Sequence, residues 1–344
     1  MEIRKLQKIK GGSFTLSIPK KWVDKRGLKS SHQIVISEEE DGSLNLHPIS
    51  SQQEYSPTAT ISLEEFSNLK ALEYNVATYY IQGAGQIDIV SKDIIPAAKK
   101  RRIKLLRLVL PGIEVSDERS NRISFQVLIN PGSFRLESLL SRTSTFSSDL
   151  QRDAVESLTK WNFPLAKEVI ERSGEALRHY RLTIRQVALA SSSRTIAREI
   201  GVRSCQECVT FALMARDLSR LVYHCSQIAR HVLALEQQKR IDQTILNWIE
   251  ELSEVAYRMQ KDAVQSFLSR DMKLALRVFK SMRKVRESEK KLLREVMAKV
   301  EDTDAAVTLV LIGRNLRRIA GHSVAIADDG MNRTLRPGNA RDRL

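Results

Sequence analysis

The sequence predicts a multidomain α+β protein with three successive parts: a β-rich N-terminal domain at residues 1–49, a small α/β segment at 58–131 and an all-α half from 132 onwards. Three observations support this prediction. Apolar and polar residues alternate near the N-terminus, helix and strand periods alternate in the middle, and strand signals disappear beyond Pro131. A chain of 344 residues also exceeds the size that one hydrophobic core usually supports, so we expect several cores.

The composition favours a basic protein of a reducing compartment. A formal net charge of +15 and a pI near 9.8 favour polyanionic partners, such as nucleic acid or an anionic membrane face. The longest apolar run, residues 305–313, is about half of what a bilayer span requires, so no membrane insertion is expected. The start of the chain lacks the apolar block of a secretory signal, and three cysteines make no disulfide framework. We therefore expect a cytoplasmic protein.

Residues 1–49 are expected to form two β-hairpins around a short helix. The strand runs are clearest at 14–18 and 33–36, with turn signals at Gly11-Gly12 and Asp41-Gly42. Pro19 fits a first helical turn because it needs no amide hydrogen there, and Gly27 fits the left-handed position that ends a helix. The expected order is therefore β-turn-β-helix-β-turn-β.

Cations are concentrated in this N-terminal domain. Residues 1–36 contain nine Lys or Arg against two acids, a net charge of +7, whereas residues 38–41 place four acids at the far hairpin. Each phosphate that such a surface neutralises releases counterions and adds affinity that does not depend on base sequence. A surface charged only for solubility would mix the two signs. The pattern favours DNA binding, with a solvated surface as the alternative.

Two short motifs stand out in the same domain: residues 12–23 read GSFTLSIPKKWV, and residues 27–29 read GLK. In this pattern of strand, IPK, short helix, GLK and strand, the domain resembles the AbrB/SpoVT (MazE-like) family of swapped-hairpin DNA-binding domains. Where that family often has PGD after the last motif, this chain has Ser30-Ser31-His32, so the turn must form without glycine.

This resemblance implies a homodimer whose two chains interleave their hairpins and bind double-stranded DNA. A domain of about 50 residues buries too little surface alone, which agrees with dimerisation. Arg and Lys would supply charge and guanine contacts, and Ser and Thr would supply hydrogen bonds to phosphate. Carried over by position, the expected DNA contacts are Arg4, Lys5, Lys8, Lys10, Ser13, Thr15, Lys20 and Lys21.

Residues 50–57 are polar and predict a linker. The α/β segment that follows is expected to contain helices at 63–82 and 93–107 and strands at 86–90, 113–118 and 123–129. It also contains a second basic cluster, at residues 99–104. This cluster could extend a DNA footprint or touch lipid headgroups, or it could be one solvated helix face.

Long helical periodicity runs from about residue 134 to 328 and repeats itself. An apolar seam that steps by three and four residues recurs 98 residues later with the same neighbours. The first copy is Leu218, Leu221, Cys225, Ile228, Val232 and Leu235, and the second is Leu316, Ile319, Ser323 and Ile326; Arg216 and Arg314, Arg220 and Arg318, and His224 and His322 match as well. A period of this length suits two three-helix bundles in tandem. Breaks near 161–164, 201, 240–243, 270–271 and 301–304 divide this half into six helices.

The segments 216–224 and 314–322 resemble the third-helix signature of PhoU, a phosphate-uptake regulator built from two such bundles. With the breaks above, the expected PhoU-like bundles occupy 132–240 and 241–328, and a disordered tail follows at 329–344. The order of an AbrB-like head before a PhoU-like tail is similar to an archaeal group of predicted phosphate regulators.

The same resemblance implies metal sites that this chain does not keep. PhoU helices use two carboxylates four residues apart, on one helix face, as metal ligands. At the matching positions this chain has Ser219 with Tyr223, Arg317 with Gly321, and Ser173 with Leu177. A cation there would lack charged ligands and would face Arg317, so no bound metal is expected.

Other residues allow two interpretations, of which we favour the second in each case. His224 and His322 could be ligands or pH switches, or hydrogen-bonded histidines beside the bundle seam. Cys205 and Cys208, with Cys225 and His224, could form a zinc site, or be small core residues. Residues 258–299, with a net charge of +8, could be a partner-docking face or a solvated one.

These observations predict a transcriptional regulator of phosphate uptake, whose head binds operator DNA as a dimer and whose bundles sense or relay a signal. The alternative is a PhoU-like adaptor that regulates a phosphate transporter or a signalling protein by protein contact, with the head serving only dimerisation. The sequence offers no catalytic residues: it has no nucleophile motif, paired acid/base carboxylates or cofactor loop, so we expect neither enzyme activity nor a cofactor.

Overall fold

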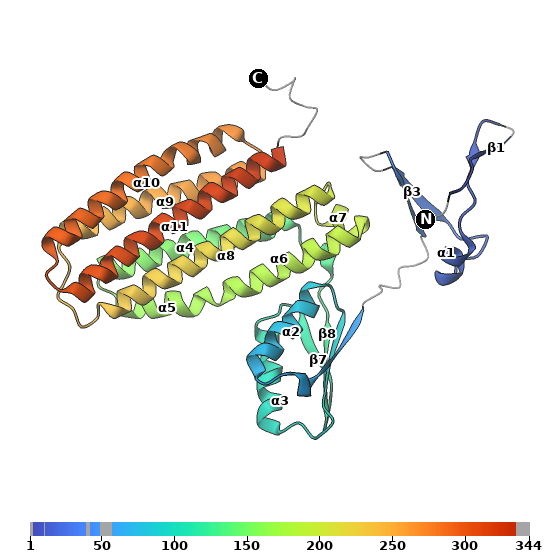
Figure 1. Ribbon diagram of the computed structural model, residues 1–344, viewed down its shortest axis with the longest axis horizontal. Helices are drawn as coiled ribbons and strands as arrows, with labels where there is room; N and C mark the ends of the chain where they lie inside the picture. Colours follow the sequence, from blue (N-terminus) through green and yellow to red (C-terminus); the bar gives the residue numbers. More distant parts are fainter. Residues whose placement is uncertain (1–2, 10, 39–41, 49–56, 335–344) are drawn as a thin grey trace. The chain divides into compact units, whose positions relative to one another are not determined.

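The computed structural model describes residues 3–9, 11–38, 42–48 and 57–334. The chain divides after Ser56 into two compact units, a small N-terminal unit and a larger second unit. Figure 1 shows that the second unit combines a small sheet with a set of long helices.

The N-terminal unit consists of two β-hairpins joined by a short helix. β1 (Gln7–Lys8) pairs antiparallel with β2 (Phe14–Thr15), α1 (Lys20–Lys25) follows, and β3 (Ile34–Glu38) pairs antiparallel with β4 (Leu44–Pro48). This order of elements agrees with the sequence prediction. Gly27 follows the helix with a φ of +60°, as expected, whereas Pro19 is the residue before the first turn and not part of it.

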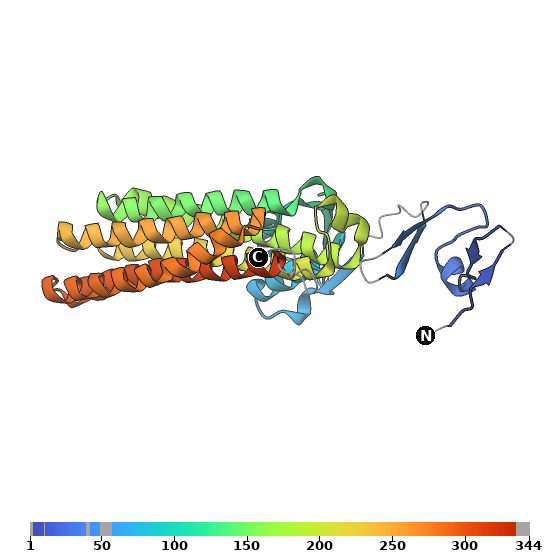
Figure 2. The same ribbon diagram turned by 90° about the horizontal axis from the view of Figure 1, so that it is seen from above.

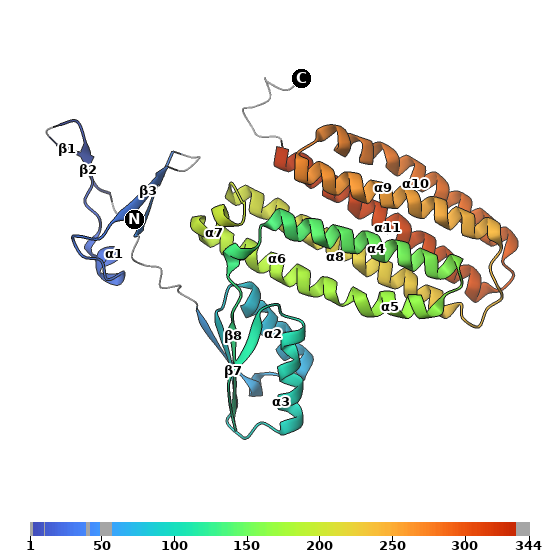
Figure 3. The same cartoon turned by 180° about the vertical axis from the view of Figure 1, so that it is seen from behind.

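A small α/β domain opens the second unit. Its elements are β5 (Thr58–Ser62), η1 (Leu63–Glu65), α2 (Leu69–Ile81), β6 (Gln86–Val90), α3 (Ala97–Lys104), η2 (Leu105–Leu108), β7 (Ile113–Arg119) and β8 (Arg122–Val127). The strand order is β5-β6-β8-β7, with β5 parallel to β6 and the other neighbours antiparallel. Both α2 and α3 cover the same face of this sheet (Figures 1 and 3).

The alternation of side chains along a strand explains which face the helices cover. On β6, Ile87 and Ile89 are buried in a core that Leu72 of α2 and Ile103 of α3 share. Asp88 lies between the two isoleucines and points to the opposite face, where its carboxylate binds Arg122. One face of the sheet is therefore apolar and covered, and the other is polar.

The start of this domain differs from the sequence prediction. Strand β5 was not anticipated, and the helix predicted from residue 63 begins only at Leu69. Asn68 sets that start because its side-chain oxygen accepts a hydrogen bond from the Ala71 amide at 2.9 Å. β5 forms because its backbone pairs with β6 along its whole length, a contact that local periodicity does not reveal.

Long helices form the rest of the described chain and run roughly along one direction (Figure 2). After a short helix η3 (Pro131–Ser133) they are α4 (Leu136–Thr159), α5 (Phe163–Ser173), α6 (Glu175–Ser192), α7 (Arg194–Glu199), α8 (Cys205–Ala234), α9 (Gln243–Ser269), α10 (Met272–Lys299) and α11 (Thr303–Thr334). The five predicted breaks all coincide with helix ends. The first bundle contains α4 to α8 and the second contains α9 to α11, and the two predicted seams are buried in one shared core.

The expected number of six helices is wrong, because the second helix of the first bundle is interrupted twice. Gly174 separates α5 from α6, and Ser193 separates α6 from the short α7. The Ser193 hydroxyl caps the first turn of α7 by accepting a hydrogen bond from the Ile196 amide. The second bundle has the single helix α10 in the corresponding place.

The expected disorder from residue 329 is also wrong for residues 329–334, which continue α11. Arg333 holds this last turn: its guanidinium lies 2.6 Å from Glu137 and 3.2 Å from Glu207, and it packs over the rings of Phe211 and Phe267. A buried, fully paired arginine resists fraying of the helix end. Residues 335–344 of the predicted tail, and residues 50–56 of the predicted linker, lie outside the described residues.

Helix α6 joins the first bundle to the α/β domain. Arg185 donates to the carbonyl oxygens of Tyr80 and Ala84, and Gln186 donates to that of Pro131 at 2.8 Å. Arg181 lies 3.2 Å from Glu73 of α2. Since these α6 side chains are buried and bonded across the boundary, the α/β domain and the bundles form one unit.

Candidate functional site

The expected DNA contacts that the structure describes are all exposed and belong to the N-terminal unit. Arg4, Lys5 and Lys8 lie before and on β1, Ser13 and Thr15 lie before and on β2, and Lys20 and Lys21 open α1. Lys10 lies outside the described residues. The Thr15 hydroxyl donates to the Gln7 carbonyl oxygen at 3.4 Å, so it also supports the hairpin. Contact of these residues with DNA stays a prediction.

Within its described residues, the N-terminal unit has no buried hydrophobic core. Val35 and Ile36 are neighbours on β3 and point to opposite faces, yet their side chains are 45% and 62% exposed. Both faces of the hairpin are therefore uncovered in a single chain. Further exposed apolar residues of this unit are Ile3, Leu6, Ile9, Phe14, Leu16 and Leu44.

The two bundles meet through reciprocal polar contacts in their interior. Gln151 of α4 donates to the carbonyl oxygen of Ser253 on α9 at 2.9 Å, and Gln260 of α9 donates to that of Ser144 on α4 at 3.2 Å. Gln260 follows Gln151 by the same number of residues as Ser253 follows Ser144. The second contact is thus a copy of the first, related to it by a pseudo-twofold axis between the bundles.

A second reciprocal pair connects α8 and α11. His224 Nδ1 lies 2.8 Å from Asn315 Oδ1, and His322 Nδ1 lies 3.0 Å from Asp217 Oδ1. The two imidazole rings are neighbours, with centroids 5.5 Å apart. Because the same offset of 98 residues relates His224 to His322 and Asp217 to Asn315, this contact is also duplicated. The histidines are hydrogen-bonded, as the favoured interpretation predicted.

The chemistry of these two histidine contacts differs. The Asn315 amide nitrogen donates to the Leu311 carbonyl oxygen, which leaves its oxygen to accept a hydrogen bond from His224. Burial lowers the pKa of His224, opposed by that hydrogen bond and aided by the nearby His322. His322 instead faces the carboxylate of Asp217, which is only 2% exposed. Sequence reasoning found the histidines but not their partners, although the repeat offset aligns Asp217 with Asn315.

Cysteines serve the core where their side chains are described. Cys208 and Cys225 are buried, and burial raises the pKa of the Cys225 thiol well above its usual range. The side chain of Cys205 is outside the described set. Among the described residues, no group of three or more His, Cys, Asp or Glu could hold a metal ion.

The positions that the resemblance associates with metal binding do not fit a metal ion. Arg317 lies 3.3 Å from Glu289, so the nearby carboxylate is already neutralised by a cation. The Ser173 hydroxyl donates to the Ile170 carbonyl oxygen at 2.6 Å, and Tyr223 is half exposed. Gly321 and Leu177 have no ligating atoms in their side chains. These residues offer no set of charged oxygen ligands.

The cationic stretch 258–299 is partly neutralised on its own surface. Arg277 forms two hydrogen bonds with Asp262, and Arg283 and Lys299 pair with acids four residues away on the same helix. Exposed pairs of this kind contribute little to stability, at most about 1 kcal/mol each. They agree with the favoured interpretation of a solvated face.

None of the helices in the described residues has the length and apolar character that a membrane span requires.

The fold and its pseudo-twofold axis define a protein with two helical bundles in tandem, α4 to α8 and α9 to α11. Residues 249–330 match a family model described as the PhoU domain. The chain is 26% identical over 199 residues to the phosphate-specific transport system accessory protein PhoU homolog 1 of Thermotoga maritima, an alignment that covers 56% of this chain and 83% of that protein. It is similar in fold to the crystal structure of PhoU from Pseudomonas aeruginosa, with a TM-score of 0.51 and 21% identity over 57% of this chain and 93% of that one. The chain therefore carries a PhoU-like helical domain.

Proposed function

We propose that this chain is an accessory regulator of phosphate transport that acts by protein contact. The observation that carries the proposal is the match of the second bundle to the PhoU domain, together with the duplicated contacts that extend the same architecture over the first bundle. The relative from Thermotoga maritima is described as an accessory protein of a phosphate-specific transport system. The glutamines between the bundles donate to backbone carbonyl oxygens of the other bundle, and we expect partners to meet the outer surfaces.

Phosphate uptake in the native host tests this proposal. Deletion of the gene is expected to change the rate of radiolabelled phosphate uptake in phosphate-rich medium, and the full chain should restore it. Co-purification of the tagged chain with the solubilised phosphate transporter should identify the contact. Unchanged uptake, with no transporter recovered, would contradict the proposal.

A second candidate function is DNA binding by the N-terminal unit, and its exposed cations and uncovered hairpins favour it. A second copy could cover both faces of the β3–β4 hairpin, and dimerisation would double the cationic surface. In this proposal Arg4, Lys5, Lys8, Ser13, Thr15, Lys20 and Lys21 contact the duplex, as does Lys10, which is outside the described residues.

A salt titration separates the two functions. For an Arg4→Ala, Lys8→Ala double variant, the dependence of log affinity on log salt should become shallower by about one unit for each lost phosphate contact. The matched control removes two exposed lysines from α10, Lys280→Ala with Lys290→Ala, and should leave DNA binding unchanged. If the unaltered chain does not bind DNA at low salt but still affects phosphate uptake, DNA binding by the N-terminal unit is contradicted and the adaptor function stands.

A further inference from the structure

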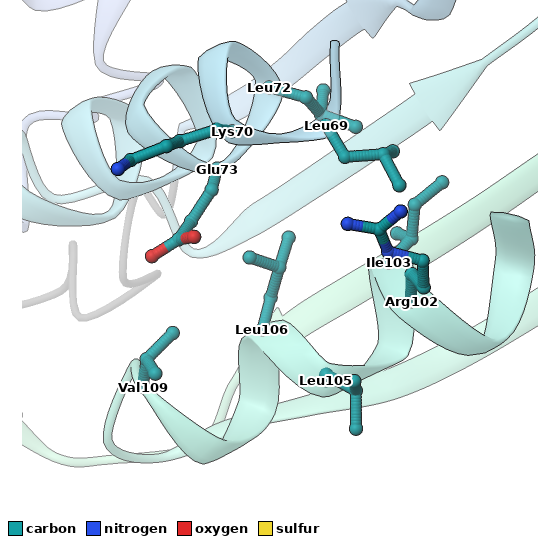
Figure 4. A pocket seen from close by; sticks show the side chains of 9 residues that line it. All are labelled: Leu69, Lys70, Leu72, Glu73, Arg102, Ile103, Leu105, Leu106 and Val109. Atoms are coloured by element: carbon teal, nitrogen blue, oxygen red, sulfur yellow. The ribbon is translucent and has the colours of Figure 1, made fainter. Parts of the chain in front are cut away.

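A groove of the α/β domain lies between α2 and the segment made by α3 and η2 (Figure 4). Leu72, Ile103 and Leu106 supply apolar lining to a cavity of about 330 Å³. A neighbouring hollow of about 370 Å³ shares Lys70 and Arg102 with it and reaches towards the start of α2. We call the two together the α2–α3 groove.

Apolar side chains remain exposed at this groove. Leu105 of η2 lines it and is 55% exposed, and nearby Leu108 is 56% exposed. In Figure 4 Arg102 is directed towards Leu69 at the N-terminal end of α2, whereas Lys70 extends along α2 and Leu105 points outward from η2. Burying such leucines against a partner would be favourable because it removes apolar surface from water.

The cations at the groove differ from the other cations of the same basic cluster. On α3, Lys104 lies 3.0 Å and Lys100 lies 3.8 Å from Glu118 of β7, so these two lysines share one carboxylate as an ion-pair partner. Lys70, Lys99 and Arg102 line the groove, and no described carboxylate lies within ion-pairing distance of them. Three cations therefore border one apolar depression.

Glu73 is the one acid that lines the first cavity, and it is already paired. Its carboxylate lies 3.2 Å from Arg181, a buried arginine of α6 in the first bundle. The positive end of the α2 dipole adds to the potential at this end of the groove. The groove is thus electropositive and apolar at once, and through Glu73 it contacts the helical bundle.

We propose that the α2–α3 groove binds an acidic amphipathic helix of a partner protein. An apolar residue of that helix fills the cavity, and flanking carboxylates meet Lys70, Lys99 and Arg102. Complementary charge and a helix seated in an apolar groove are a common mode of peptide recognition. A small anion would use the cations but leave the apolar floor uncovered, and a DNA backbone would bury little of the leucine surface. The inference goes beyond the proposed function, because the groove lies outside both the N-terminal unit and the matched bundle.

Fluorescence anisotropy with the full-length chain tests this inference. The probe is a labelled helical peptide of about 18 residues, or roughly five turns, with leucine on one face and glutamate on the other. Lys70→Glu with Arg102→Glu should weaken its binding by about tenfold or more, because four units of charge change at the contact. Leu105→Ala, which leaves the charge unchanged, should weaken binding by about fivefold through lost apolar burial.

The matched control is Lys280→Glu with Lys290→Glu, which makes the same charge change on α10 and should alter affinity by less than about twofold. Equal weakening by the two double variants, or equal binding of a peptide whose leucines are replaced by alanine, would overturn the inference in favour of bulk attraction. Duplex DNA or phosphatidylglycerol vesicles that bind through Lys70 and Arg102, while the peptide does not, would also overturn it. Unchanged thermal melting of each variant confirms that it is folded, and phosphate uptake reports separately on the proposed function.

Discussion

The two bundles repeat the same contacts, but the duplicated contacts have not kept the same chemistry. Across α4 and α9, a glutamine amide donates to a serine carbonyl oxygen in both directions. Across α8 and α11, one histidine meets an asparagine and the other meets an aspartate. The comparison teaches that the pseudo-twofold axis fixes where side chains meet without fixing their charge. A substitution at one position can therefore be compared with the residue at the matching position of the other bundle.

The largest expected effect is at the helix end that Arg333 holds. The repeat offset matches Arg333 with Leu235, which is fully buried in the first bundle. Arg333→Leu makes the two ends alike but leaves Glu137 and Glu207 without this partner, so the free energy of unfolding should fall by about 3 kcal/mol. Urea denaturation measures the loss. The control Arg283→Leu removes an exposed pair with Glu287 and should cost less than about 0.5 kcal/mol.

A pH-dependent effect is expected where Asp329 matches His231. Burial raises the pKa of Asp329 to about 7 from its ordinary 3.8, with Asp217 and Asp328 adding to the rise and Arg216 opposing it. The folded state therefore binds more protons, and the stability this group supplies below pH 3.8 is lost as the pH rises through about 7. Asp329→Asn should raise the free energy of unfolding by about 1–3 kcal/mol at pH 8 and not at pH 4. A gain that is equal at both pH values would contradict this.

His231 sharpens the same comparison, because its dependence has the opposite sign. Burial lowers the pKa of His231, so the unfolded state binds more protons and stability is lost as the pH falls below its ordinary 6.5. His231→Leu should therefore stabilise the protein at pH 5 relative to pH 8. Denaturation curves at the two pH values measure the difference. If His231→Leu stabilised the protein more at pH 8 than at pH 5, as expected for Asp329→Asn, burial of the imidazole would not be the cause.

A smaller and symmetric effect is expected at the glutamine contacts. Gln151→Leu and Gln260→Leu each remove buried hydrogen bonds, and each should lower the free energy of unfolding by about 1–2 kcal/mol. If the axis relates equivalent environments, the two losses should agree within about 0.5 kcal/mol, with coupling between them in the double variant. A large loss at one position alone would show that the bundles pack differently there.

The smallest effect on stability is expected from Asn315→Asp, which makes the two histidine contacts alike. The new carboxylate lies where the amide oxygen is now 2.8 Å from His224 Nδ1, so the pKa of His224 should rise. NMR titration of the imidazole measures the rise, while the free energy of unfolding should change by less than about 1 kcal/mol. An unchanged pKa of His224 would mean that the variant side chain turns away from the ring.

Local patterns predicted much of this fold. The positions of the helix breaks follow from capping and helix-breaking residues near them, and the two buried seams follow from steps of three and four residues. Charge and a motif in neighbouring residues predict the candidate DNA contacts, and the structure places the described ones on the surface. Sequence patterns do not predict strand β5, because its alternation of apolar and polar residues is short and its partner strand is distant along the chain.

The sequence by itself determined the helical periodicity, the internal duplication and the unequal distribution of cations. These properties depend only on neighbouring residues or on a fixed repeat distance. Only the tertiary structure decided that Asp217 faces His322, that Arg333 anchors the end of α11, and that Lys70 and Arg102 share a groove while Lys104 pairs with Glu118. Each of these contacts joins residues that are distant along the chain. Their charges interact over a few ångströms of space, and sequence separation does not encode that distance.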